Sequence, residues 1–163
     1  REDTRPPIDF DALTIPVGTE IKKGRNAWFW SKSTVTGEDF RVVWDTGSCA
    51  LSLQDTWASR QVYAQSDRAR ELGRPLREDE LMLAQLRKLP TKQYLVGFTE
   101  TDGTAPAITT QGLIRIPVPQ PGGAPMRYLP WLRFRIMKKQ REICLIPNDT
   151  WDGLRMMPYK EVW

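Results

Sequence analysis

The sequence places Asp45-Thr46-Gly47 between two apolar segments that have the composition of β-strands. The preceding segment, 40–44, is apolar apart from Arg41, and the following segment, 49–53, alternates apolar and small residues. Alternation with a period of two is typical of a half-buried strand. A carboxylate at the end of a buried strand is costly to desolvate, and Gly47 permits a tight turn directly after it. Asp45 is therefore the first candidate for a functional carboxylate.

The same three residues also fit a plain turn. Asp, Thr and Gly are all common in turns, so an Asx-type turn that only joins two strands is the alternative interpretation. A surface turn of that kind is expected to have polar flanks, whereas the flanks of Asp45 are apolar. Two other Asp-Thr pairs, Asp55-Thr56 and Asp149-Thr150, are not followed by glycine. The context of Asp45 favours the functional interpretation.

The length and composition predict one folded domain over 1–163. A chain of 163 residues with 40% hydrophobic residues and seven tryptophans can bury a sizeable core without metals or disulfides. No apolar run approaches the roughly 18 residues that span a bilayer, so no membrane association is expected. The segment 1–7 is charged and proline-rich, unlike a signal peptide, and the start at Arg1 suggests a fragment of a longer polypeptide.

The chain contains two cysteines, Cys49 and Cys144, and no histidine. Both cysteines lie in apolar segments, which predicts buried thiols and a reducing, intracellular and cytoplasmic location. The lack of histidine removes the usual general base for a Ser or Cys nucleophile and the commonest metal ligand. We therefore expect no metal and no cofactor, and any hydrolytic chemistry must depend on carboxylates.

The order of apolar and turn-forming segments predicts a mostly β domain with helices in its middle. Asp55 is expected as the N-cap of the first helix, with Gly73 and Pro75 ending it, and Pro90 is expected to end the second. The expected elements are a short strand (13–21), a hairpin (26–35 with 40–44), two helices (55–72 and 77–89), a second hairpin (95–118), a third hairpin (128–137 with 142–146) and a short helix from 149 or 150 to 156.

Basic residues are concentrated between Arg127 and Arg141, among aromatic residues. Basic and aromatic residues together could bind nucleic acid, with Arg133 and Arg135 as the main contacts. The favoured alternative is a strand with Phe134 on its apolar face and the two arginines on the other, followed by a solvated basic turn. Nucleic acid is therefore the less favoured partner.

The order of these segments resembles a subunit of the retropepsin-like aspartic proteases of retroviruses and long-terminal-repeat retrotransposons. The motif that carries the resemblance is Asp45-Thr46-Gly47-Ser48 after a hairpin. The second hairpin would be the flap, with Asp102, Gly103 and Thr104 at its tip, and 143–146 would precede the short C-terminal helix. The resemblance implies a closed antiparallel β-barrel, with a helical insertion over 54–90.

The resemblance also implies an activity. Such proteins are homodimers that hydrolyse extended peptides or polyproteins between two aspartates, which here would be Asp45 of each subunit. Thr46 would hold the two active-site loops together, and Gly47 would permit close approach of the substrate. Trp44 is bulky for its position, and Pro147 stands where the family has a glycine. These departures keep open a catalytically inactive dimerisation or binding module within a larger, transposon-derived protein.

Actin-like sugar kinases and ATPases also carry an Asp-x-Gly motif after an apolar strand. They need roughly twice this length and a second phosphate loop, which the sequence lacks.

Overall fold

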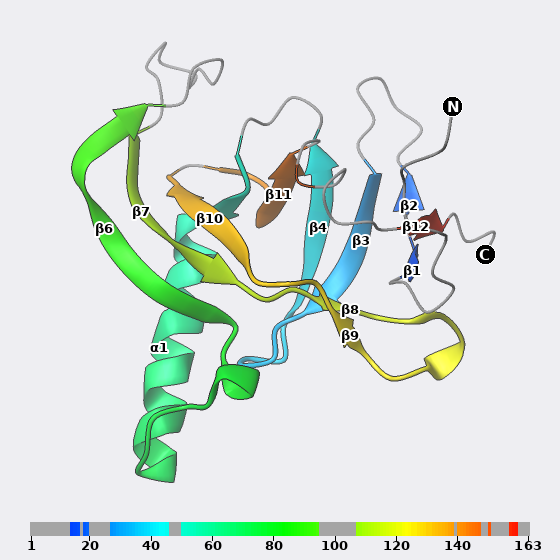
Figure 1. The fold of residues 1–163 in the computed structure, drawn as a ribbon, viewed down its shortest axis with the longest axis horizontal. Coiled ribbons are helices and arrows are strands. Elements are labelled where there is room, and N and C mark those ends of the chain that lie inside the picture. Colours follow the sequence, from blue (N-terminus) through cyan, green and yellow to red (C-terminus); the bar gives the residue numbers. More distant parts are fainter. Residues whose placement is uncertain are drawn as a thin grey trace, which may run out of the picture.

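The structure, a computed structural model, describes residues 14–16, 18–19, 27–45, 50–94, 107–138, 140–147, 150 and 157–159. Within these residues the chain is mostly β, as the sequence predicts, and it contains one long helix (Figure 1). The strands and the helix are β1 (Thr14–Pro16), β2 (Gly18–Thr19), β3 (Ala27–Lys32), β4 (Asp39–Asp45), β5 (Ser52–Gln54), α1 (Asp55–Leu72), β6 (Leu83–Tyr94), β7 (Ala107–Ile114), β8 (Pro117–Val118), β9 (Arg127–Tyr128), β10 (Leu132–Met137), β11 (Cys144–Pro147) and β12 (Met157–Tyr159). Two 3₁₀ turns cover Glu78–Glu80 and Pro121–Gly123.

Eight of the described strands form one sheet, in the order β2-β3-β4-β11-β5-β10-β7-β6. The pairs β4–β11 and β5–β10 are parallel, and the other neighbours are antiparallel. The edges β2 and β6 do not pair with each other, so the sheet is open and mixed within the described residues, in contrast to the expected closed antiparallel barrel. The sheet is mixed because β11 pairs with β4 in parallel and β10 pairs with β5 in parallel. Outside this sheet, β1 pairs with β12 in parallel and β8 with β9 in antiparallel.

The first predicted hairpin is confirmed. Strands β3 and β4 pair in antiparallel from Ala27–Trp44 to Lys32–Asp39. The turn closes through hydrogen bonds from the Ser33 N–H to the Glu38 carbonyl (2.8 Å) and from the Gly37 N–H to the Ser33 carbonyl (3.0 Å). Gly37 has φ +75°, which glycine adopts without the penalty of a side chain.

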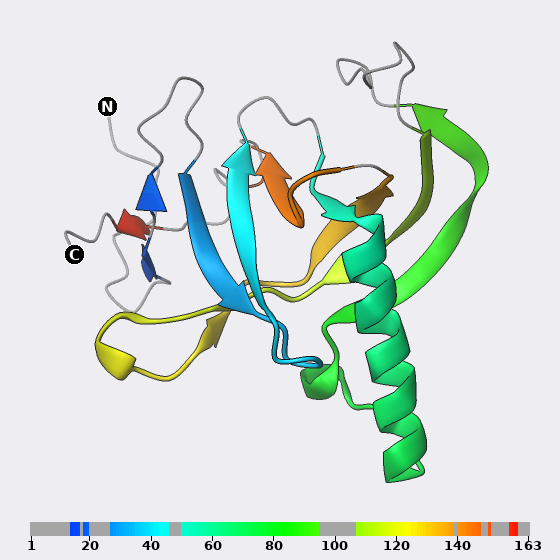
Figure 2. The same cartoon turned by 180° about the vertical axis from the view of Figure 1, so that it is seen from behind.

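Helix α1 covers one face of the sheet, where it contacts β5, β10 and β6 (Figure 2). Gln54 is its N-cap and makes no side-chain capping bond, so Asp55 is the first helical residue rather than the predicted cap. Gly73 ends the helix as predicted, in the left-handed conformation, and its N–H bonds to carbonyls of the last turn. The buried face of α1 carries Trp57 and Ala58, together with Gln61 and Gln65.

The predicted second helix, 77–89, is wrong. Only Glu78–Glu80 forms a 3₁₀ turn, and from Leu83 the chain is strand β6, which pairs with β7. The leucine spacing fitted a helix, but Gln85 has φ +51°, which a helix interior excludes. Pro90 is tolerated because β6 is an edge strand, where one side of the backbone has no partner strand in the sheet. Tertiary pairing therefore overrides the local periodicity.

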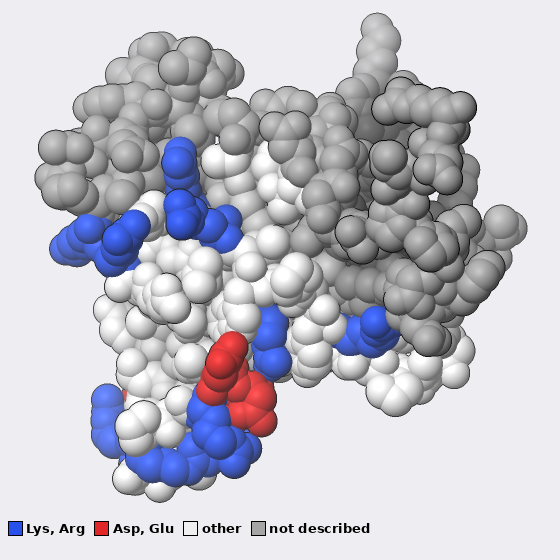
Figure 3. Space-filling view, in the orientation of Figure 1, with Lys and Arg blue, Asp and Glu red and all other residues white. Residues whose placement is uncertain are grey.

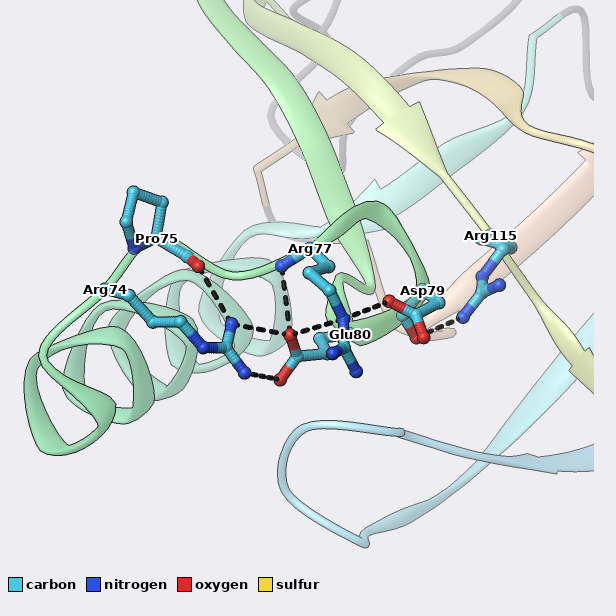
Figure 4. A network of polar contacts seen from close by, with 6 residues as sticks. All are labelled: Arg74, Pro75, Arg77, Asp79, Glu80 and Arg115. Atoms are coloured by element: carbon cyan, nitrogen blue, oxygen red, sulfur yellow. Dashed lines mark hydrogen bonds and ion pairs between the residues drawn. The ribbon is translucent and has the colours of Figure 1, made fainter.

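A polar network holds the connection between α1 and β6 (Figure 4). Arg74 Nη1 lies 2.8 Å from Glu80 Oε1, and the Arg77 N–H donates to the same oxygen (3.1 Å). The hydrogen bonds from Arg74 and from the Arg77 backbone lower the pKa of Glu80 to about 2. Arg115, which follows β7, donates to the Asp79 carbonyl (2.7 Å). The connection is therefore attached to the sheet.

The third predicted hairpin is also wrong, because β10 and β11 are not neighbours. Strand β5 separates them, pairing in parallel with β10 and in antiparallel with β11. The expected C-terminal helix from 149 or 150 to 156 lies outside the described residues except for Thr150. No helix in the described part of the chain combines the length and the apolar character that crossing a membrane requires.

The core lies between α1 and the sheet face that it covers. It combines aromatic and aliphatic side chains from most strands of the sheet and from α1. Its buried members are Phe29, Phe40, Val42, Leu51, Leu53, Trp57, Ala58, Met82, Leu83, Ile114, Ile116, Val118, Leu129, Phe134, Cys144 and Ile146.

Candidate active site

Asp45 is the last residue of β4, so the predicted strand before it is confirmed. The strand is central in the sheet, between β3 and β11, and its residues Val42 and Val43 are buried. The side chain of Asp45 and the whole of Thr46 and Gly47 lie outside the described residues. The geometry of this site therefore comes from the backbone of Asp45 and from the strands around it.

Strand β11 brings a distant segment next to Asp45. It pairs with β4 in parallel, and Pro147, its last residue, is the register partner of Asp45. The next strand in sequence after β4 is β5, but β11 lies between them. Asp45 and the start of β5 therefore lie about two strand spacings apart, roughly 10 Å, with β11 between them. Because β4 and β11 are parallel, Asp45 and Pro147 lie at the same end of the sheet.

Polar contacts fix the register of these three strands. Arg41 on β4 forms a two-pronged ion pair with Glu142, just before β11, and its guanidinium lies 5.5 Å from the Trp28 ring centroid. Gln140 donates to the Ser52 carbonyl on β5 (3.2 Å). These contacts join the segment before β11 to both β4 and β5.

Trp44 on β4 and Cys144 on β11 both pack in or against the core. Trp44 is partly buried and packs against the core cluster, so its bulk is accommodated within the domain. Cys144 is fully buried, as predicted, and burial raises the pKa of its thiol. A buried thiol of this kind is protonated at neutral pH and is a poor nucleophile. Cys49 lies outside the described residues.

The hairpin β6–β7 reaches the same end of the molecule as β4 and β11. The end of β6 and the ends of β4 and β11 all lie toward the top of both ribbon views (Figures 1 and 2). The hairpin begins at Leu83, earlier than the predicted start at residue 95. Its predicted tip residues Asp102, Gly103 and Thr104 lie outside the described residues.

The basic segment divides between different surfaces. Phe134 is buried in the core, and the alternating residue Arg133 is exposed on the other side of β10, which confirms the strand interpretation. The aromatic residues Tyr128 and Trp131 lie near the Arg115 guanidinium, at 4.2 and 6.0 Å from their ring centroids. The cation–π contacts that the described residues show for these two rings are therefore with Arg115 and not with the arginines of β10.

Sequence reasoning missed three polar residues that the fold uses: Gln65, Arg87 and Gln111. Gln65 is buried on α1 and bonds to the start of β6, whereas Arg87 and Gln111 are cross-strand partners on β6 and β7. The signal for Gln65 was an amide on the same helical face as Trp57. Arg87 and Gln111 gave no local signal, because the segment containing Arg87 was predicted as helix.

Comparisons with protein-family models, with curated proteins and with solved structures gave no match.

Proposed function

We propose that the chain is one subunit of a homodimeric, retropepsin-like aspartic endopeptidase, in which Asp45 of two copies forms the catalytic pair. The observation that carries the proposal is the position of Asp45 at the end of a central strand, beside the end of β11. Because β4 and β11 are parallel, Asp45 and Pro147 lie at the same end of the sheet, which is where the predicted Asp45-Thr46-Gly47 turn would begin.

The chemistry follows from two like charges held close together. Two carboxylates about 3 Å apart do not both ionise, so one retains its proton. The ionised carboxylate removes a proton from water, which attacks the scissile carbonyl, while the protonated one donates to the carbonyl oxygen. The chain contains no histidine, so a carboxylate pair is the acid–base system that its composition favours. One Asp45 per chain requires a second copy.

Binding of an extended peptide would use the turn and the hairpin at this end of the molecule. Thr46 would brace the two turns against each other, and Gly47 would allow the substrate backbone to approach. The tip of β6–β7, with Asp102, Gly103 and Thr104, would close over the peptide and exclude water. The substrate class is an extended peptide or polyprotein, and the proposal includes no metal and no cofactor.

The test is cleavage of an unfolded-peptide library by concentrated protein from acidic to neutral pH. Asp45→Asn should remove all cleavage, because the amide cannot supply the ionised base. The matched control is Asp55→Asn, the same change at the start of α1, which should leave the rate within about twofold. Activity should fall on both sides of an optimum pH, since the pair must carry one proton.

Either of two results would contradict the proposal. Cleavage by Asp45→Asn at the wild-type rate would remove Asp45 from the mechanism. A folded, dimeric wild-type protein that cuts no peptide would instead favour the inactive dimerisation or binding module. Dimerisation alone does not separate the two, because both predict it.

A further inference from the structure

Three arginines share the sheet face opposite α1. Arg135 on β10 and Arg87 on β6 are both register partners of Gln111 on β7, and Arg133 is the partner of Leu113. Directly paired residues point to the same face of a sheet. The partner of Gly112 is Phe134, and a Cβ built on Gly112 would lie 2.9 Å from its ring, so those two residues mark the opposite, core face.

Two of these arginines, Arg87 and Arg133, line a hollow in the sheet surface. The hollow has a volume of about 310 Å³ and is lined by Gln85, Arg87, Gln111, Gly112, Leu113 and Arg133. Neighbouring strands are about 4.8 Å apart, so Arg87 and Arg135 stand on backbones roughly 10 Å apart. Guanidinium groups on side chains of that length can converge on one small ligand. We call the residues that line the hollow, together with Arg135 as the β10 register partner of Gln111, the arginine pocket.

The charge of the arginine pocket is not balanced within the described residues. No ion pair joins Arg87, Arg133 or Arg135 to a carboxylate there, although arginines elsewhere, such as Arg41 and Arg74, have such partners. Figure 3 shows basic side chains over β6, β7 and β10 with no acidic side chain among them in the described part of this face. Clustered like charges repel one another, and a bound anion would relieve that repulsion.

One arginine of the pocket is held in place by a neighbour. Gln111 is only 8% exposed, and with its amide oxygen turned toward β6 it accepts from Arg87 Nε (2.7 Å) and Nη2 (2.5 Å). The side chain of Arg87 is therefore oriented before any ligand arrives, which reduces the entropy lost on binding. The rest of its guanidinium remains able to meet a carboxylate, which a planar fork binds in two-pronged geometry.

We propose that the arginine pocket binds carboxylate side chains of an acidic peptide segment. Carboxylate is favoured over nucleic acid because nucleic-acid binding would also use aromatic surfaces for base stacking, and the pocket lining contains no aromatic residue. The hollow is also the size of one or two side chains rather than a groove that follows a phosphate backbone. The proposal does not depend on Asp45, and the peptide can be a substrate or a separate partner.

The test measures binding of a fluorescent ten-residue peptide that carries two Glu residues, compared with the same peptide carrying Gln. It uses the full chain with Asp45→Asn, so that cleavage cannot consume the probe, at low ionic strength. We expect the Glu peptide to bind at least tenfold more tightly than the Gln peptide. Arg133→Gln should lower the affinity for the Glu peptide about tenfold and leave the affinity for the Gln peptide unchanged. Arg133→Lys should lower the affinity for the Glu peptide by a smaller factor.

The matched control is Arg68→Gln, which removes the same charge from an exposed position on α1. It should change peptide affinity less than twofold, and thermal unfolding of each variant checks that the fold is retained. The proposal would be overturned by any of three results: equal affinity for the two peptides, no binding of either peptide, or a loss of affinity in Arg68→Gln equal to that in Arg133→Gln. The experiment is repeated with a single-stranded oligonucleotide of the same charge. If the oligonucleotide binds more tightly and displaces the peptide, the pocket binds nucleic acid instead.

Discussion

Replacement of Gln65 tests how α1 and β6 are joined. The Gln65 amide oxygen accepts hydrogen bonds from the N–H groups of Met82 (2.8 Å) and Leu83 (2.9 Å), and its nitrogen donates to the Leu83 carbonyl (3.0 Å). Met82 and Leu83 are buried, and Gln65 is only 9% exposed. One side chain therefore satisfies three backbone groups that water does not reach.

The variant Gln65→Leu keeps most of the side-chain volume but leaves all three backbone groups unpaired. An unsatisfied buried polar group costs about 1–3 kcal/mol, so the free energy of unfolding should fall by at least about 3 kcal/mol. That is a large fraction of the roughly 5–15 kcal/mol that stabilises a typical domain. For a chain of this size the melting temperature should fall by roughly 6–12 °C.

The assay is urea unfolding of wild type, Gln65→Leu and Ser66→Ala, followed by circular dichroism. Ser66 is the exposed neighbour on the same helix, so its replacement should change stability by less than about 0.5 kcal/mol. If Gln65→Leu lowers the free energy of unfolding by less than about 1 kcal/mol, with an unchanged denaturant slope, the inferred role of the three hydrogen bonds is wrong. Such a result would mean that water or a shifted backbone replaces these bonds.

Two further perturbations test other parts of the fold. Gly112→Ala would place a Cβ 2.9 Å from the Ala84 carbonyl oxygen and from the Phe134 ring. Thermal unfolding should therefore show a free energy of unfolding lower by about 1–3 kcal/mol. An unchanged melting temperature would contradict the close approach of β6 and β7. The pKa of Glu80 is lowered to about 2, so its contribution to stability is complete above the unfolded-state pKa near 4.5 and is lost as the pH falls through 2. Glu80→Gln should therefore lower the melting temperature at pH 6 and much less at pH 2, where the folded-state carboxyl is about half protonated. An equal effect at both pH values would contradict the ion pair with Arg74.

The parts of the fold that sequence predicted correctly are those specified by nearby residues. The β3–β4 hairpin follows from a turn in which Gly37 adopts a positive φ, and the end of α1 follows from Gly73 in the same conformation. The strand that ends at Asp45 follows from its own apolar residues. These features depend on backbone preferences within a few residues, which a single sequence displays directly.

The errors concern pairing between distant segments. Residues 83–89 satisfied a helical spacing of leucines, yet β7 pairs with them as a strand, and Gln65 bonds to the start of that strand. The position of β11 between β4 and β5 was also unpredicted, because nothing near residue 144 indicates which strands it joins. At this site the local pattern predicted the acidic residue Asp45 at the end of a strand. It did not predict that Pro147 is the register partner of Asp45.

The wrong prediction of a helix over 77–89 is also the reason that the sequence did not predict the arginine pocket. In a helix over 77–89, Arg87 would be one exposed charge among several, whereas in β6 it is the cross-strand partner of Gln111. That partnership aligns Arg87 with Arg135, from β10 on the other side of β7. Because α1 covers the opposite face of these strands, their arginine-bearing face is not closed by the helix. The segment 54–90 therefore supplies both the covering helix and most of the edge strand β6, on which Arg87 of the proposed arginine pocket lies.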